Sequence, residues 1–171
     1  MHQSPDAEDW RKLMRVIGYL KKNPDKRLVL KAQNDIKINA YVDASFGLHR
    51  DGKSHSGMVV YLGDAPLYFS STKQKIVAKD STEAELVGLS DSLGMVGKIR
   101  DFISNQGYHG ISPNIYQDNL STISLVTKGG GKPRAKHKKA RQYMVKEMID
   151  NKEIQVHLTK SEFMVADALT K

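Results

Sequence analysis

The feature of this sequence that most constrains its fold is a long amphipathic helix, predicted to run from Ser81 to about Asn105. Apolar residues recur along it at helical spacing and form a single stripe: Leu89, Leu93, Val96, Ile99 and Ile103. Ser81 or Thr82 is expected to cap the first turn, because a short polar side chain there accepts hydrogen bonds from free backbone N–H groups. The apolar stripe is therefore expected to face the core.

Two glutamates in the first turn of this helix face opposite ways. At 100° per residue, Glu85 projects onto the apolar stripe, whereas Glu83 lies about 160° from it and is interpreted as a solvated acid at the positive end of the helix dipole. A bare carboxylate on a core-facing stripe is costly unless it meets a cation. Glu85 is therefore expected either to pair with a lysine or arginine, or to belong to a functional site.

Length and composition favour one α/β domain with an appendage, since 171 residues with 39% hydrophobic content can bury a conventional core. The absence of cysteine excludes disulfides and thiolate metal sites, so a bound metal would need oxygen or imidazole ligands, which favours hard cations such as Mg²⁺. No run of eighteen apolar residues occurs, and polar residues follow Met1. We therefore expect a soluble, intracellular protein without a signal peptide.

The formal charge of +8 favours a polyanionic partner or an acidic membrane surface. Residues 128–146, the basic segment, contain eight lysines or arginines and no acid, next to the glycine triplet Gly129–Gly131. A lysine-rich helix face is often merely solvated, but an uncompensated block beside a glycine hinge favours contact with phosphates. The candidates for such contacts are Arg134, Lys136, His137, Lys138, Lys139 and Arg141.

The N-terminal segment predicts a separate helix that begins at Ser4-Pro5 and ends at Asn23-Pro24. Its apolar residues lie at helical spacing: Trp10, Leu13, Met14, Ile17 and Leu20. An isolated helix with such a stripe needs a surface to cover. It is either docked on the rest of the chain or the tail of a preceding domain, and the second interpretation is favoured.

The remaining patterns predict five strands. From Ile36 the apolar residues alternate with period two, giving a first strand that ends at Asp43, and residues 57–62 and 66–71 predict a hairpin around Gly63-Asp64. The first three strands are thus expected to be antiparallel. Further along the chain, a short strand at 114–117 leads into Asp118-Asn119 and a second helix that ends at about Val126. Another helix is predicted after residues 132–141. The chain then continues with a strand at 153–158 and a last helix from Val165.

Four carboxylates occupy comparable positions in this pattern. Asp43 and Asp118 lie at strand ends, while Glu85 and Asp167 lie in first helical turns. In open α/β sheets these places converge, and clustered acids repel one another unless divalent cations bind among them. Two cations about 4 Å apart would activate a water and stabilise the leaving oxygen of a phosphodiester. Four acids at element ends also arise by chance, so the pattern alone leaves a metal site unproven.

Seven short motifs follow one another along the chain: Tyr41-Val42-Asp43-Ala44, Ser56-Gly57, Ser70-Ser71-Thr72-Lys73-Gln74, Ser81-Thr82-Glu83-Ala84-Glu85, Gln117-Asp118-Asn119, Lys136-His137 and Ala166-Asp167-Ala168-Leu169-Thr170-Lys171. In order and spacing the sequence resembles the ribonuclease H domain of copia-type long-terminal-repeat retrotransposon Pol polyproteins. The resemblance covers residues 36–171, and the helix at Trp10 resembles the end of the preceding reverse transcriptase. It implies two parts: residues 1–35, the end of the reverse transcriptase or a connecting segment, and residues 36–171, an α/β ribonuclease H-like domain. Its mixed five-stranded sheet, with the first three strands antiparallel, is flanked by helices and followed by a truncated last helix.

The resemblance also implies an activity and its ligands. The family's metal-binding acids fall on Asp43, Glu85, Asp118 and Asp167, and the choice of Glu85 agrees with the helical projection. The implied reaction is the hydrolysis of the RNA strand of RNA/DNA hybrids during reverse transcription, with two Mg²⁺ ions, for which Mn²⁺ would substitute, leaving a 5′ phosphate and a 3′ hydroxyl. The implied partners are the hybrid and the rest of the Pol polyprotein, and the implied location is a cytoplasmic virus-like particle.

Cellular relatives carry a histidine in the loop before the last helix, but residues 159–165 contain none, which leaves Glu162 as a weak candidate for that role. Recognition of 2′ hydroxyls near the metals is assigned to Ser81, Thr82 and Asn119. Two other functions stay open. One is a non-catalytic hybrid-binding domain, and the other is a nuclease or strand-transferase of the same fold that acts on duplex DNA.

Overall fold

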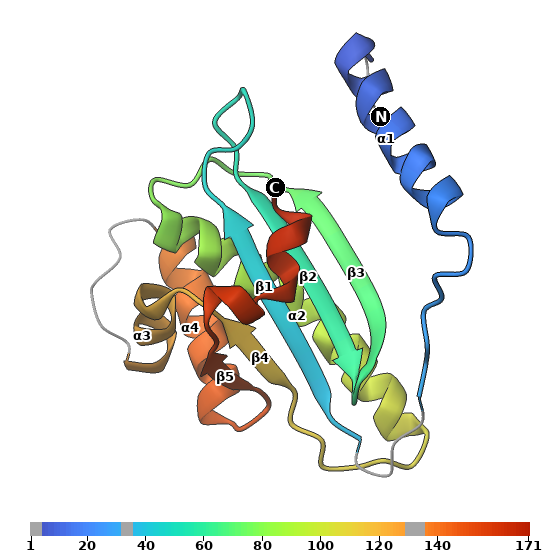
Figure 1. Ribbon diagram of the computed structural model, residues 1–171. Helices are drawn as coiled ribbons and strands as arrows, with labels where there is room; N and C mark the ends of the chain where they lie inside the picture. The colour runs from blue at the N-terminus through green and yellow to red at the C-terminus, as the bar shows by residue number, and fades with distance from the viewer. Residues whose placement is uncertain (1–4, 32–35, 129–135) are drawn as a thin grey trace.

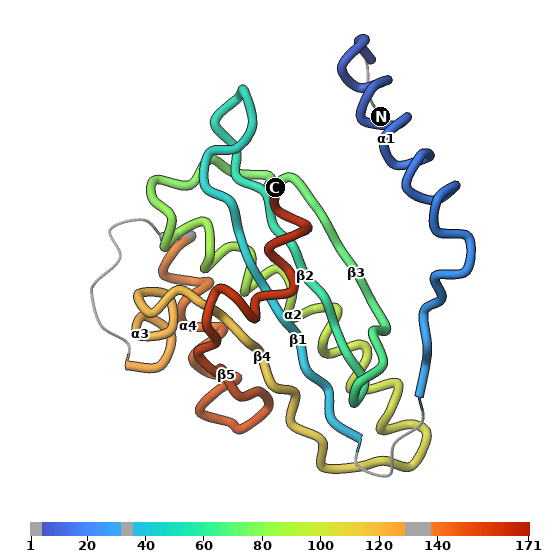
Figure 2. The backbone as a smooth tube through the Cα atoms, viewed as in Figure 1, coloured from blue at the N-terminus to red at the C-terminus, as the bar shows by residue number. Residues whose placement is uncertain are grey.

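The chain forms one mixed five-stranded sheet with the strand order β3-β2-β1-β4-β5 (Figures 1 and 2). The computed structural model describes residues 5–31, 36–128 and 136–171, and the side chains of the last range from Lys138 onward. The strands are β1 (Ile38–Ser45), β2 (His55–Leu62), β3 (Ala65–Lys73), β4 (Asn114–Gln117) and β5 (Gln155–Leu158). The helices are α1 (Ala7–Lys22), α2 (Ser81–Asn105), α3 (Leu120–Lys128) and α4 (Lys136–Asp150), with short 3₁₀ turns η1 (Ser161–Phe163) and η2 (Val165–Leu169).

The predicted antiparallel arrangement of the first three strands is confirmed. β1 pairs with β2, and β2 pairs with β3. The hairpin that joins β2 to β3 turns at Gly63, whose positive φ of 60° suits glycine. β4 joins the other edge of β1 in parallel, and β5 joins β4 in parallel. β1 extends to Ser45, because its ladder with β2 continues to the Ser45–His55 pair. Asp43 therefore lies two residues before the end of its strand, not at the end as predicted.

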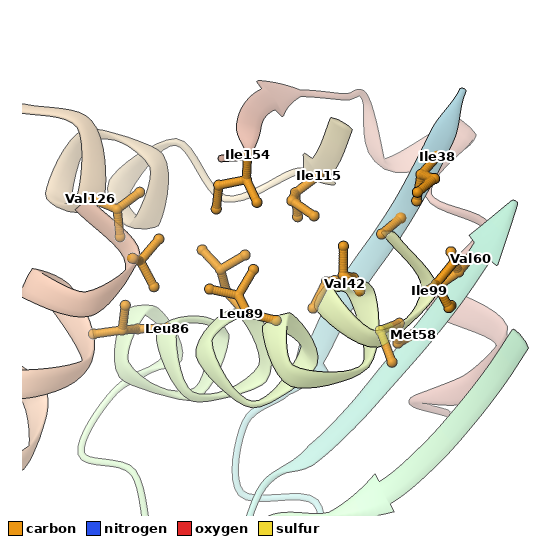
Figure 3. Packing of buried hydrophobic residues seen from close by; sticks show 14 of the residues in the cluster. Ile38, Val42, Met58, Val60, Leu86, Leu89, Ile99, Ile115, Val126 and Ile154 are labelled. Atoms are coloured by element: carbon orange, nitrogen blue, oxygen red, sulfur yellow. The ribbon is translucent and has the colours of Figure 1, made fainter. Parts of the chain in front are cut away.

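Helix α2 covers one face of the sheet, and its predicted stripe is buried against it. Figure 3 shows this packing, in which Ile99 of α2 lies beside Val60 of the sheet and Leu89 faces Ile115, while Leu86 lies toward Val126 of α3. The helix ends at Asn105 as predicted, but its cap is Asp80, not Ser81 or Thr82. Asp80 has extended backbone angles, and its carboxylate accepts the N–H of Glu83 at 2.8 Å, so it satisfies a free donor of the first turn.

Gly88 allows α2 to approach the sheet closely beside β1. A Cβ atom at this position would lie 3.2 Å from Ser56 Oγ, 3.6 Å from Ala44 Cβ and 3.7 Å from the carbonyl oxygen of Asp43. The first distance is tight, so the side chain of Ser56 would have to shift, whereas the other two are ordinary van der Waals contacts. The missing side chain therefore leaves α2 packed directly on Ala44 and Ser56, next to Asp43.

Helix α1 stands apart from the sheet in Figure 1. It begins at Ala7 with Asp6 as its cap, not at Pro5, because Asp6 and Asp9 form a reciprocal capping box. Its apolar stripe is exposed, with Trp10 63% accessible. Within the described ranges, no helix is long and apolar enough to cross a membrane.

Candidate functional site

Three carboxylates from distant parts of the sequence meet at one end of the sheet. Asp43 comes from β1, Asp118 is the residue after β4, and Glu85 is the fifth residue of α2, just past its first turn. One carboxylate oxygen of each lies within 4.8 Å of the others. Asp43 and Glu85 are buried and Asp118 is half-buried, so this acidic cluster opens to solvent on the Asp118 side. Three of the four predicted metal ligands are thus brought together.

Electrostatics in the acidic cluster oppose ionisation. Burial, followed by the charge of Asp43, raises the pKa of Glu85 to about 8, although a hydrogen bond from Gln117 acts in the other direction. Burial also raises the pKa of Asp43, where the hydroxyl of Thr170 opposes the shift and the charges of Asp118 and Asp167 add to it. Burial and like charge thus raise both pKa values. A cation bound among the carboxylates would lower them again.

Each carboxylate of the cluster accepts a hydrogen bond from a neutral side chain. Gln117 Nε2 donates to Glu85 Oε2 at 2.8 Å, Ser161 Oγ donates to Asp118 Oδ2 at 2.8 Å, and Thr170 Oγ1 donates to Asp43 Oδ2. The donor to Glu85 is an amide, not the lysine or arginine of the ion-pair interpretation. These bonds orient the carboxylates without neutralising them.

Asp167, the fourth predicted ligand, lies on η2 beside the acidic cluster. It is half-buried, and its carboxylate contacts the ammonium group of Lys171. Its charge contributes to the raised pKa of Asp43, so it lies within electrostatic range of the cluster. It is not part of the tight group of three.

The interpretation of Glu83 as a solvated acid is wrong. Glu83 is only 1% exposed, and its Oε2 accepts the backbone N–H of Lys79 at 2.9 Å. The reason is the position of the cap. With Asp80 as the cap, Glu83 occupies the third helical position, from which an acidic side chain folds back onto the chain that precedes the helix. Glu83 therefore has a structural role at the start of α2.

The residues predicted to meet 2′ hydroxyls are near neighbours of Glu85 and Asp118 in the sequence. Ser81 is exposed and Thr82 half-buried in the first turn of α2, while Asn119 follows Asp118 directly. Asn119 Oδ1 accepts the N–H of Thr122 at 3.1 Å, which caps α3. Its amide NH₂ group is not needed for that cap. Contact of these three residues with nucleic acid stays a prediction.

The predicted phosphate-binding residues are in different environments. Arg134 lies outside the described residues, and Lys136 and His137 open α4. Lys138 Nζ lies 3.6 Å from Asp80, and Lys139 Nζ lies 5.5 Å from the ring centre of Tyr143. Arg141 contacts Ser90 and Asp91 of α2. Arg141 therefore also holds α4 against α2, a role that its place in a charged run did not indicate.

A groove that the sequence did not predict lies between β3, α2 and α4. It has a volume of about 450 Å³, and its lining includes Lys73, Lys75 and Arg141. The buried Gln74 also lines it and ties the end of β3 to β2 and α2, since its Nε2 donates to Ser56 Oγ and to the carbonyl of Ala84, both at 2.8 Å. The sequence signal is the Lys73-Gln74-Lys75 triplet, in which a buried amide alternates with exposed cations.

Solved structures share this fold. The LC11 ribonuclease H1 isolated from compost superposes with a TM-score of 0.59 at 18% identity, over 78% of this chain and 91% of that protein. The same enzyme in complex with an RNA/DNA hybrid gives 0.59 at 17% identity, over 78% and 93%. The prototype foamy virus protease-reverse transcriptase gives 0.56 at 14% identity, over 83% of this chain and 21% of that one.

Similar sequences are transposon polyproteins. The chain is 32% identical over 173 residues to the retrovirus-related Pol polyprotein from transposon RE2 of Arabidopsis thaliana, and 26% identical over 170 residues to that from transposon TNT 1-94 of Nicotiana tabacum. These matches cover 100% and 99% of this chain but 12% and 13% of the polyproteins, so the chain spans about an eighth of their length. No family model matches the chain.

The strand order and the acidic cluster together define a ribonuclease H-like domain. With the sequence matches, the chain belongs to the ribonuclease H domains of copia-type retrotransposon Pol polyproteins.

Proposed function

We propose that this domain hydrolyses the RNA strand of RNA/DNA hybrids during reverse transcription of a retrotransposon, in a reaction that depends on divalent metal ions. The observation that carries the proposal is the convergence of Asp43, Glu85 and Asp118 within 4.8 Å, with the pKa of Glu85 raised to about 8. An enzyme gains nothing in stability from crowding acids in this way, so the cluster indicates a cation-binding site.

The donor set fits Mg²⁺ or Mn²⁺. All the converging ligand atoms are carboxylate oxygens, which hard cations prefer, and the chain contains no cysteine that would select a softer metal. Asp43, Glu85 and Asp118 would hold the first ion, and Asp167 would complete a site for a second from η2. Bound metal supplies a water of lowered pKa and charge stabilisation for the leaving oxygen of the phosphodiester.

The protein's own contribution is orientation and the supply of negative charge. Gln117, Ser161 and Thr170 each donate to one oxygen of Glu85, Asp118 and Asp43 respectively, so the carboxylates are oriented by neutral donors and their charge is left for a ligand. No serine or cysteine nucleophile is required, and we expect no covalent intermediate. The products would be a 5′ phosphate and a 3′ hydroxyl. The residue that assists product release stays unassigned, and Glu162, on η1 next to Ser161, remains a candidate by position.

Divalent metal is expected to stabilise the protein, and more strongly at higher pH. The folded-state pKa of Glu85 is about 8 against an ordinary value of 4.5, so the folded state holds this proton more tightly than the unfolded state does. The stabilisation from this group is complete below the unfolded pKa and is lost as pH rises toward about 8, by at most about 1.4 kcal/mol per pH unit. A cation that binds only the folded, ionised cluster restores the loss.

Thermal unfolding with and without millimolar Mg²⁺ or Mn²⁺, at about pH 6 and about pH 8, measures this effect. We expect a larger rise in melting temperature at the higher pH. A melting temperature that metal leaves unmoved at both pH values would argue strongly against a shared metal site.

A cleavage assay tests the function itself. Labelled RNA/DNA hybrid, duplex DNA, single-stranded RNA and single-stranded DNA are incubated with the protein in Mg²⁺ or in a chelator. Hydrolysis of only the RNA strand of the hybrid, and only with metal, is expected. Binding of the hybrid without cleavage would support the non-catalytic alternative, and cleavage of duplex DNA would support the other nuclease.

The basic segment is proposed to hold the phosphate backbone of the hybrid. Lysines 136, 138 and 139 lie on one turn of α4, and the nearby groove adds Lys73, Lys75 and Arg141. Such contacts position a duplex without reading its sequence. Ser81 and Thr82, which precede Glu85 on α2, and Asn119, which follows Asp118, are proposed to meet the nucleic acid near the metals.

Replacing Lys136, Lys138 and Lys139 together with glutamine is expected to weaken hybrid binding and to flatten its salt dependence, by about one unit of slope for each phosphate that the variant no longer neutralises. Arg141 is left intact because it pairs with Asp91 of α2. Fluorescence anisotropy across a salt series is the measurement, and the response of the melting temperature to metal should not change.

The matched control neutralises Lys21 and Lys22, two exposed lysines at the end of α1. If the triple variant keeps the original affinity and slope while this control loses both, α4 presents a solvated face and the duplex is held by the lysines and arginines of residues 11–31.

Residues 1–35 are proposed to be the end of the reverse transcriptase or a connecting segment, and residues 36–171 the nuclease domain. Two observations support this division. The sequence matches to Pol polyproteins extend through α1, and the apolar stripe of α1 is exposed. A protein that lacks residues 1–35 and fails to fold would contradict the division.

A further inference from the structure

A chain of three hydrogen bonds runs across the sheet edge to the turn that carries Asp167. His49 Nε2 lies 3.0 Å from His55 Nδ1, His55 Nε2 lies 2.8 Å from Ser71 Oγ, and Ser71 Oγ donates to the carbonyl oxygen of Leu169 at 2.8 Å. These hydrogen bonds join the β1–β2 loop, the start of β2, the end of β3 and η2. The mechanism proposed above uses none of these three side chains.

The direction of every proton in this chain follows from the last bond. A serine hydroxyl has one proton, and Ser71 gives it to Leu169, so the N–H on His55 Nε2 must donate to Ser71 Oγ. Nδ1 of the neutral His55 ring then accepts from the N–H on His49 Nε2. Burial, and secondarily His49, lower the pKa of His55, which favours that neutral ring.

The turn held by this chain lies close on the sheet. A Cβ atom at Gly57 would come within 2.7 Å of the carbonyl oxygen of Ala166 and 2.8 Å of the side chain of Thr170. Thr170 also donates a hydrogen bond to Asp43, so the same turn contacts the acidic cluster. The position of Asp167 is therefore set by how η2 sits on β2, and Leu169 is the point at which β3 holds it.

We propose that His49, His55 and Ser71 form a clamp that positions η2, and through it Asp167, against the acidic cluster. Ser71 is the positioning residue in contact with η2, and the two histidines orient its hydroxyl. The inference rests on the proposed function in one respect: Asp167 must be the ligand that completes the metal site. The clamp itself is a property of the metal-free fold and is tested without catalysis.

Hydrogen exchange of the metal-free protein is the first test, with Ser71→Ala as the variant. The backbone N–H groups of Asp167 and Thr170 are bonded within the turn, to the carbonyls of Met164 and Asp167. Loss of one hydrogen bond to the turn should speed the exchange of residues 164–171 about fivefold. Ser71→Thr keeps the hydroxyl and should restore the original rate. Ser70→Ala, on the opposite face of β3, is the matched control and should change nothing.

Metal binding is the second test. In Ser71→Ala, calorimetric titration with Mn²⁺ should show weaker binding, and the Mg²⁺ concentration for half-maximal hydrolysis should rise about fivefold while the KM for hybrid is unchanged. Ser71→Thr should behave as the unaltered protein in both measurements. A merely structural role would lower the melting temperature without this selective effect on metal.

Unchanged exchange of residues 164–171 in Ser71→Ala would overturn the proposal, as would a failure of Ser71→Thr to restore it. Faster exchange confined to the β1–β2 loop would also overturn it, because the histidines would then only stabilise the hairpin. If the unaltered protein shows no hydrolysis, the proposed function fails, but the exchange measurement still decides whether the clamp exists.

Discussion

Replacing Asp118 with asparagine is expected to abolish hydrolysis of the hybrid while leaving folding and hybrid binding nearly intact. Asparagine keeps the shape of the side chain and can still accept the hydrogen bond from Ser161, but it removes one ligand charge. Bound metal supplies several kcal/mol of transition-state stabilisation, and each 1.4 kcal/mol or so is tenfold in rate, so a loss of roughly a thousandfold is expected.

The structure adds a control to this experiment. The charge of Asp118 helps to raise the pKa values of Glu85 and Asp43, so its removal relieves repulsion in the metal-free cluster. The melting temperature of the metal-free variant should therefore be unchanged or higher, while its response to Mg²⁺ is reduced. Cleavage at even a tenth of the original rate would show that Asp118 is not a ligand.

Glu85→Gln and Glu83→Gln form the second pair, in which only the first should lose activity. Both residues are buried near the start of α2, with Glu85 6% and Glu83 1% exposed, so burial does not distinguish them. Glu85 lies in the acidic cluster, whereas Glu83 accepts a backbone hydrogen bond from Lys79. Glutamine at position 83 retains an acceptor for that bond, and the expected cost is about 1 kcal/mol of stability.

Single-turnover cleavage and thermal unfolding of the two variants separate these roles. Glu85→Gln should lose hydrolysis by roughly a thousandfold, since it removes a ligand charge, and its metal-free melting temperature should not fall. Glu83→Gln should cleave at close to the original rate and melt slightly lower. Equal loss of activity in both variants would contradict the assignment of Glu85 as the ligand.

Much of the fold could be predicted because hydrophobic period and turn chemistry act locally. The stripe of α2, the Gly63-Asp64 hairpin and the short strand before Asp118 follow from residues that are neighbours in sequence. Helical projection also identified Glu85 as the unusual acid. It was wrong for Glu83, because a projection assigns each side chain a direction but does not show where the cap lies or how a first-turn side chain folds back over it.

The rest of the site depends on contacts between distant residues, which no local pattern contains. The pairing of Arg141 with Asp91, the hydroxyl of Ser161 on Asp118 and the bond from Ser71 to Leu169 join residues far apart in the chain. Serines and histidines in these positions have no period that marks them. The sequence could therefore propose the ligands but not the side chains that orient them.

The spread of the acidic cluster along the chain has a consequence for biosynthesis. The hydrogen bond from Thr170 to Asp43 joins residues 127 positions apart. β1 likewise pairs with a strand far along the chain, since Asn39 lies opposite Asn114 of β4. Contacts between residues so far apart in the sequence form late in folding, after loops of many residues have closed. During synthesis, β1, the hairpin and α2 emerge before Asp118 and the turn of residues 161–171, so they form without a complete set of acids. If the proposed function holds, hydrolysis begins only after that turn has been synthesised and has docked on β2.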